Sequence, residues 1–294
     1  MLNSLEVTQL NDDLPNKHNT NKEVLMSNRV NKIGEVISRD TRNTVLSRYK
    51  TVTKAINREF RNSESETMYS LYVGSYGRGT AINTSDVDIL VELPKEEYER
   101  FDYAKGNGQS RLLQAVKKAI QVAYPRSDVR ADGQIVKINF SDGMKFEILP
   151  AFKNWDGTYI YPDTNTGGIW RSSNPKAEQE IMNSKNKNSN GLFKDTCKHM
   201  RSIRNENYTS YHLSGIVIDT FVYHAIGNWH WSEGESSNPA PAGAYEKVLL
   251  DYLNGVKQRS FLYGTNMTVP GSNQNIDVSK DLDCLTKVVE YMNR

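Results

Sequence analysis

The chain has 294 residues, and its 37 basic against 35 acidic side chains give a formal net charge of +2. This length exceeds the usual size of one hydrophobic core and predicts two lobes. The net charge is too small to argue for bulk nucleic-acid binding, which would need a local basic patch, and no apolar run approaches the ~20 residues that span a bilayer.

The N-terminal part of the chain changes character near residue 26. Residues 1–25 are polar, rich in asparagine and without apolar periodicity, which predicts a loose segment. From Val30 to Phe60 apolar side chains recur at helical spacing. This pattern predicts one long helix, or two helices joined near Asp40, packed along both lobes.

An acidic pair follows a glycine-rich segment. Residues 69–73 and 88–92 are typical of short strands, and side chains two apart on a strand share a face. Asp86 and Asp88 should therefore point together into a cleft while Val87 and Ile89 enter the core. Two such carboxylates repel each other unless a divalent cation lies between them, and oxygen ligands suit Mg²⁺.

The glycine-rich turn supplies anion-binding groups. Gly74 lets backbone N–H groups approach an anion closely, and Ser75 adds a hydroxyl donor. Either fragment alone is more often a solvated turn, but their combination, with Asp86 eleven residues after Ser75, indicates a phosphoryl- or nucleotidyl-transfer site. Arg78, next to the glycines, contacts phosphate or pairs with an acid.

A later hairpin provides a third carboxylate. After a helix predicted at 109–122, residues 134–140 and 145–149 are typical of two strands joined at Asp142-Gly143. Glu147 is the only acid in the second strand and has apolar neighbours. Pairing through a two-residue turn sets Glu147 opposite Ile138, so we expect a bulge in this hairpin.

The rest of the chain is predicted to be mainly helical. Residues 153–176 are interpreted as a crossing loop, and 183–190 as a polar break between helices. Helices are expected at 176–182, 191–205, 213–226, 244–254 and 278–292, with a loop at 232–241.

Cysteine and histidine usage gives no metal pattern. Cys197 and Cys284 lack metal-ligand spacing, so we expect buried free thiols in a reducing cytosol. The five histidines form no zinc motif, and His224 and His230 are interpreted as packing residues. No secretory signal pattern opens the sequence, and we expect a cytoplasmic protein.

The order Gly74-Ser75, Asp86-x-Asp88 and Glu147 resembles the signature of the polymerase-β-like nucleotidyltransferase superfamily. Many members have Asp where this chain has Glu147, which keeps the oxygen ligand. Five further segments are similar to the bacterial cyclic GMP-AMP synthase / oligoadenylate synthetase-like enzymes (CD-NTases, SMODS type): residues 146–152, 170–175, 193–201, 214–223 and 269–275.

The resemblance implies an α+β fold. A polymerase-β-like nucleotidyltransferase lobe with a mixed β-sheet would pack against a mainly helical second lobe. We place the catalytic lobe, with its long N-terminal helix, at 26–155. The helical lobe, which would complete the nucleotide-binding cleft, occupies 156–294.

The resemblance also implies an enzyme and its cofactor. It would join nucleoside triphosphates (ATP, GTP or pyrimidine NTPs) into a cyclic di- or trinucleotide second messenger, with release of pyrophosphate, in bacterial anti-phage signalling. Asp86, Asp88 and Glu147 would hold two Mg²⁺ ions, with Mn²⁺ as a substitute. Gly74 and Ser75 would bind the β- and γ-phosphates.

The second lobe and the partners follow from the same resemblance. Arg201 and Ser214 match the positions that grip the triphosphate tail, and Lys198 lies one turn away as a substitute for Arg201. Alternatively, Lys198, Arg201 and Arg204 form the solvated stripe of an amphipathic helix. We expect a monomer, no membrane, no long nucleic acid, and a downstream cyclic-nucleotide effector.

Two other functions stay open. One is a transferase that adds a nucleotide to RNA, a small molecule or a protein. The other is an inactive member that binds a nucleic acid or a partner protein. Retention of the Gly-Ser pair and all three acids argues against the inactive form.

Overall fold

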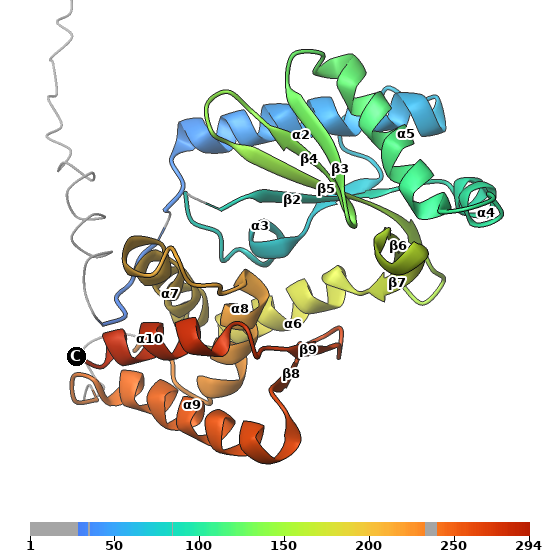
Figure 1. Ribbon diagram of the computed structural model, residues 1–294. Helices are drawn as coiled ribbons and strands as arrows, with labels where there is room; N and C mark the ends of the chain where they lie inside the picture. The colour runs from blue at the N-terminus through green and yellow to red at the C-terminus, as the bar shows by residue number, and fades with distance from the viewer. Residues whose placement is uncertain (1–28, 35, 84, 233–239) are drawn as a thin grey trace, which may run out of the picture.

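The structure, a computed structural model, describes residues 29–34, 36–83, 85–232 and 240–294, without the side chains of 260–263. The expected loose segment, residues 1–25, lies outside this part of the chain. A mixed β-sheet with its own helices lies beside a group of helices, which confirms the α+β fold (Figure 1). None of the described helices combines the length and apolarity needed to cross a bilayer.

The sheet has seven strands in the order β1-β2-β5-β4-β3, and β6 and β7 continue it from β5. Strands β2 and β5 are parallel, and the other neighbours are antiparallel. The strands are β1 (Ser70–Tyr72), β2 (Val87–Glu92), β3 (Asp128–Asp132), β4 (Ile135–Asn139), β5 (Lys145–Lys153), β6 (Tyr159–Asp163) and β7 (Ile169–Ser173).

Two helices, α2 (Arg39–Arg61) and α5 (Gly108–Ala123), cover one face of this sheet (Figure 1). Their apolar sides meet Val87, Ile89 and Phe146 in one core, and these three strand residues are fully buried. Because strand side chains alternate between faces, the residues between them point to the other face, toward the second group of helices. The helix expected at 109–122 is confirmed, whereas α4 (Lys95–Asp102) was not predicted.

The second group of helices has a separate core, to which all five contribute. The helices predicted at 191–205 and 213–226 are confirmed with small changes of boundary, and both expected free cysteines are buried in this core. The elements are α6 (Pro175–Asn188), α7 (Leu192–Asn207), α8 (Gly215–Ala225), α9 (Ala244–Tyr263) and α10 (Leu282–Met292), with the hairpin β8 (Asn266–Thr268) and β9 (Asn275–Asp277).

The predicted helix start at Val30 is wrong. Ser38 caps helix α2, because its side chain accepts a hydrogen bond from the Thr41 N–H at 3.1 Å. Val30 is buried in the helical core, where its N–H donates to Glu246 Oε1 at 3.0 Å. The described residues before α2 therefore form an extended link to the second lobe, and their apolar spacing reflects burial rather than helix.

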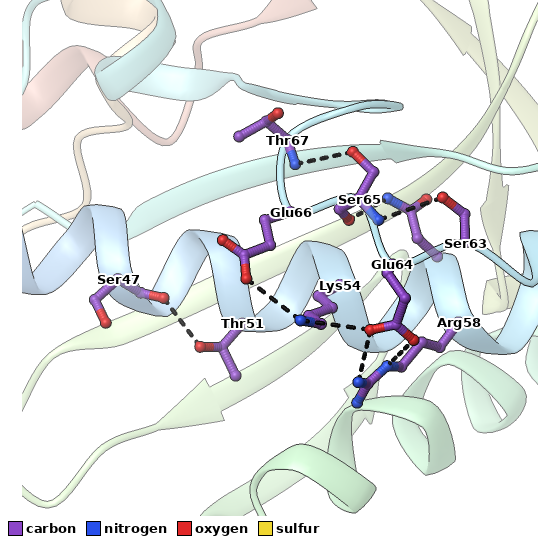
Figure 2. A network of polar contacts seen from close by, with 10 residues as sticks. Ser47, Thr51, Lys54, Arg58, Ser63, Glu64, Ser65, Glu66 and Thr67 are labelled. Atoms are coloured by element: carbon purple, nitrogen blue, oxygen red, sulfur yellow. Dashed lines mark hydrogen bonds and ion pairs between the residues drawn. The ribbon is translucent and has the colours of Figure 1, made fainter.

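Helix α2 ends at Asn62, which has a left-handed φ of 48°. The chain then runs back beside the helix, with Lys54 Nζ 3.4 Å from Glu64 and 3.5 Å from Glu66 (Figure 2). Arg58 donates to both oxygens of Glu64, at 2.6 and 2.7 Å (Figure 2). These ion pairs hold the segment that leads to β1 beside the helix. Because their side chains are largely exposed, they add little stability.

Two loop predictions in the middle of the chain are wrong. Residues 153–176 contain β6, a short 3₁₀ turn (Asn165–Gly167) and β7 instead of a crossing loop. The expected polar break at 183–190 is mostly helix, because α6 continues to Asn188 with its polar residues largely on the solvent side. The chain breaks at Asn190 and Gly191, where φ is 50° and 95°.

Three features near the C-terminus also differ from expectation. Helix α9 runs to Tyr263 rather than ending at 254, and α10 begins at Leu282 rather than at 278. Residues 269–275 form the tip and the first residue of the return strand of a β8–β9 hairpin, whose two strands were not predicted. Short strands with few apolar residues carry almost no periodic signal, so the sequence pattern missed this hairpin.

Candidate functional site

Two of the predicted acids are direct neighbours on adjacent strands. Asp88 on β2 pairs with Glu147 on β5 in the parallel register (β2 and β5 lie side by side in Figure 1). Both side chains lie on the sheet face opposite α2 and α5, and Asp86 precedes β2 by one residue. Val87 and Ile89 enter the core as predicted.

The register of the hairpin that carries Glu147 is shifted by one residue, as the expected bulge requires, and the extra residue lies in the turn. Its loop holds three residues, 141–143, and Gly143 adopts a positive φ of 87°. The longer loop moves the register by one residue and places Lys137, rather than Ile138, opposite Glu147. A shift of one residue sends a side chain to the other face, and here it sends Glu147 toward the helical lobe.

The glycine-rich segment forms the one-turn helix α3 (Gly74–Arg78) rather than an open turn. Gly74 has φ of 57°, and a Cβ built on it would lie 1.8 Å from Asp88 Oδ2. Only glycine fits this position, because the Asp88 carboxylate lies directly against its backbone. The same fit places Ser75 next to the acidic pair.

A cleft of about 730 Å³ lies between the sheet and helices α7 and α8. Seven of the eight predicted site residues line it: Gly74, Ser75, Asp86, Asp88, Glu147, Arg201 and Ser214. The eighth, Lys198, does not, because its Nζ donates to the Gly34 carbonyl at 2.8 Å. The cleft also takes in residues that the sequence pattern did not single out, among them Ser85, Gln134 and Asn205.

A larger cavity, of about 850 Å³, lies in the helical lobe beside Trp229 and Trp231. Glu246 is the only acid among its described lining residues, and that carboxylate already accepts a hydrogen bond from Val30 N–H. Its lining includes Ser232 and Ala240, which are the last and first described residues on either side of 233–239. The acidic cleft is therefore the candidate active site, although it is the smaller of the two.

The electrostatics of the cleft favour a cation. Burial, followed by the negative charges of Glu147 and Asp86, raises the pKa of Asp88 to about 7, although Arg78 opposes the shift. Burial also raises the pKa of Glu147, against the opposing charge of Lys137, whose Nζ is 3.7 Å from Oε1. A divalent cation would remove this repulsion.

The donor set fits a hard cation such as Mg²⁺. Three carboxylates line one cleft, and hard cations prefer oxygen ligands. Within the described ranges, no three His, Cys, Asp or Glu side chains already stand in a metal-binding cluster. The assignment of a cation site therefore rests on the oxygen ligands that the three carboxylates offer and on the position of the Asp88 carboxylate against the Gly74 backbone.

Arg201 is held by a buried acid that the sequence analysis did not consider. Its Nη1 lies 2.6 Å from Asp219 Oδ1, and only 6% of the residue is exposed. The prediction of a solvated stripe is therefore wrong for Arg201. For Arg78, the structure contains the second alternative, pairing with an acid, because its Nε donates to Asp219 Oδ2 at 2.7 Å. The signal that was missed is a lone aspartate in the apolar run 216–222.

Comparison with solved structures supports the same fold. The chain is similar to Elizabethkingia meningoseptica CdnE cyclic dinucleotide synthase at 15% identity and a TM-score of 0.58, covering 92% of this chain and 96% of that chain. It is also similar to Rhodothermus marinus CdnE c-UMP-AMP synthase, at 15% identity and a TM-score of 0.56, covering 88% and 92%. Escherichia coli MS115-1 CdnC aligns at 13% identity and a TM-score of 0.56, over 93% and 89%.

No curated protein matches the chain in sequence. The family model of the Second Messenger Oligonucleotide or Dinucleotide Synthetase (SMODS) domain matches residues 27–186, more than half of the chain. That range contains helix α3, the acidic pair and Glu147. The chain therefore belongs to the SMODS family of nucleotidyltransferases, the synthetases of oligonucleotide and dinucleotide second messengers.

Proposed function

We propose that this enzyme joins nucleoside triphosphates into a cyclic di- or trinucleotide, with release of pyrophosphate, in anti-phage signalling. The observation that carries the proposal is the register of β2 and β5, in which Asp88 and Glu147 are direct partners beside helix α3. Family membership supports the reaction class. Two structural relatives, the synthase with GTP and Apcpp and the synthase with Apcpp and Upnpp, support triphosphate substrates.

Asp86, Asp88 and Glu147 would hold two divalent ions, Mg²⁺ or Mn²⁺. Bound there, the metal would lower the pKa of the attacking sugar hydroxyl and neutralise charge on the phosphate oxygens. Glu147 also borders the cleft on the strand next to Asp88, where its carboxylate can accept the proton of that hydroxyl. Its raised pKa makes it a better proton acceptor than an exposed glutamate.

The triphosphate would lie between α3 and the start of α8. The Gly74 backbone and the Ser75 hydroxyl would donate to the β- and γ-phosphates as charge develops on pyrophosphate. Ser214 lies across the cleft, and its side chain makes no capping hydrogen bond to α8, so its hydroxyl can turn to the phosphate tail. Arg201 borders the same wall, whereas Lys198 would have to release the Gly34 carbonyl to reach it.

The proposal includes the setting of the enzyme. It would act as a monomer in the cytoplasm, where buried free thiols such as Cys197 and Cys284 remain reduced. Its product would trigger a downstream effector that binds cyclic nucleotides. Strands β6 and β7 extend the catalytic sheet, so we propose to place the boundary between the lobes after Ser173.

The test is incubation of the purified protein with Mg²⁺ and each α-³²P-labelled nucleoside triphosphate, alone and in pairs. We expect pyrophosphate release and a labelled product that resists phosphatase. Asp86→Ala and Asp88→Ala should both abolish release while the proteins stay folded by circular dichroism. Asp283→Ala is the matched control, because Asp283 lies on α10 with a side chain 68% exposed and should leave activity unchanged.

Other products would change the assignment. Label that is transferred to added RNA, protein or a small molecule would favour a different nucleotidyltransferase activity. Full activity in folded Asp86→Ala or Asp88→Ala protein would remove the metal-binding role from these residues.

A further inference from the structure

We infer that Asp219 is a positioning residue for the proposed nucleotidyl transfer, because its single carboxylate ties helix α3 to the helical lobe through two cleft arginines. The catalytic part of this inference rests on the proposed function. Asp219 itself does not line the cleft and would touch neither nucleotide nor metal.

The Asp219 carboxylate joins three elements at short range. Oδ1 lies 2.6 Å from Arg201 Nη1 on α7, and Oδ2 lies 2.7 Å from Arg78 Nε at the end of α3. Oδ2 also accepts a hydrogen bond from Thr80 Oγ1 at 2.9 Å. Asp219 is on α8 and is 0% exposed, so these contacts are made without competing water.

Both arginines also contact other residues around the cleft. Arg201 Nη2 also donates to the Gly215 carbonyl at 2.9 Å, at the first residue of α8. Arg78 Nη1 lies 3.7 Å from Glu178 Oε2 on α6. Since Arg78 ends the helix that begins with Gly74, a movement of α3 relative to α8 would break buried ionic contacts.

The charges on Asp219 and the arginines depend on each other. Burial alone would raise the pKa of Asp219, but Arg201 and Arg78 outweigh it and lower the pKa to about 2. The carboxylate is therefore charged at neutral pH. Without it, two buried guanidinium groups would face each other with no shared counter-ion, which is strongly unfavourable. Residues 74–80 would then lose their fixed position beside Asp88.

The experiment compares Asp219→Asn with Asp195→Asn. Asp195 is a suitable control because it is also a mostly buried aspartate of the helical lobe, bonded to Trp231 Nε1 at 2.9 Å, and it does not line the cleft. Backbone hydrogen exchange of peptide 74–82 is measured by mass spectrometry, together with kcat and KM for the triphosphate below the Tm of each variant.

We expect Asp219→Asn to speed exchange in peptide 74–82 by at least about tenfold, since local opening no longer breaks the ionic link. We expect kcat to fall by about tenfold to hundredfold, with a smaller change in KM, because misplacing catalytic groups by about 1 Å costs that much. Asp195→Asn should change neither the exchange rate of peptide 74–82 nor kcat, even if the Tm of this variant falls.

Unchanged exchange in peptide 74–82 would overturn the inference, whatever the activity. Faster exchange with wild-type kcat would also overturn it, because Asp219 would then be structural only. If Asp219→Asn does not fold, Thr80→Val replaces it, since this variant removes only the hydroxyl that donates to Asp219 Oδ2. Wild-type protein without pyrophosphate release would refute the proposed function separately, because the exchange measurement needs no turnover.

Discussion

Substitution of Gly74 by alanine tests the geometry of the site most directly. The added Cβ would lie 1.8 Å from Asp88 Oδ2, whereas nonbonded contact needs about 3.5 Å. The carboxylate or the backbone must therefore retreat by at least about 1.5 Å, and a shift of about 1 Å at a reacting centre costs on the order of a hundredfold in rate. The left-handed φ of 57° adds roughly 1–2 kcal/mol of strain for any residue with a Cβ.

The strain and the clash can be separated with a second glycine. Gly227 has a similar φ of 54°, but a Cβ built there meets nothing within 4 Å. We expect Gly227→Ala to lose stability only, whereas Gly74→Ala should also lose at least about a hundredfold in kcat. Pyrophosphate release gives kcat, and thermal unfolding gives Tm. If Gly74→Ala is no less active than Gly227→Ala, the assigned contact between Gly74 and Asp88 is wrong.

Four further substitutions test the burial and charge of individual side chains. Because the folded pKa of Asp88, about 7, lies above the unfolded value near 4, metal-free protein should lose about 4 kcal/mol as pH rises across that interval. Without Mg²⁺, Asp88→Asn should therefore have a higher Tm than wild type at pH 8 and an equal Tm at pH 4. Ile148→Ala should lower the free energy of unfolding in urea by roughly 2–5 kcal/mol because the side chain is 0% exposed, whereas Trp155→Ala, at 99% exposure, should not change it. Glu64→Ala should leave Tm unchanged in a thermal melt, although it removes the exposed ion pair with Arg58.

Local sequence patterns were sufficient to place a helix or strand where the segment has one dominant apolar face or is apolar throughout. Strand β2 and helices α5, α7 and α8 were placed correctly, because their apolar residues either repeat with a single period or form one continuous run. The acidic pair lines one cleft, as predicted. The same reasoning failed at 30–38 and at 159–173. There the burial of residues such as Val30 and Tyr159 depends on contacts far along the chain, so the spacing of apolar residues does not reveal the local secondary structure.

The hairpin before Glu147 contained the information for its own register. A two-residue turn pairs Ile138 with Glu147, whereas the observed three-residue loop pairs Ile138 with Phe146 and Lys137 with Glu147. The second arrangement places apolar side chains together on the core face and opposite charges together on the cleft face. Comparing both registers by the chemistry of their cross-strand pairs selects the correct one, whereas the turn motif alone does not.

The arginines of α7 required a different comparison. Lys198, Arg201 and Arg204 recur every three residues, so periodicity assigns similar exposure to all of them. Asp219, eighteen residues after Arg201, makes the difference, since a charge is stable in a core only beside a partner. An acid inside an apolar run therefore implies a buried cation on a neighbouring helix. Considered alone, Arg201 resembles a ligand of phosphate; considered with Asp219, it is first a part of the structure that joins helix α3, the proposed phosphate-binding element, to the helical lobe.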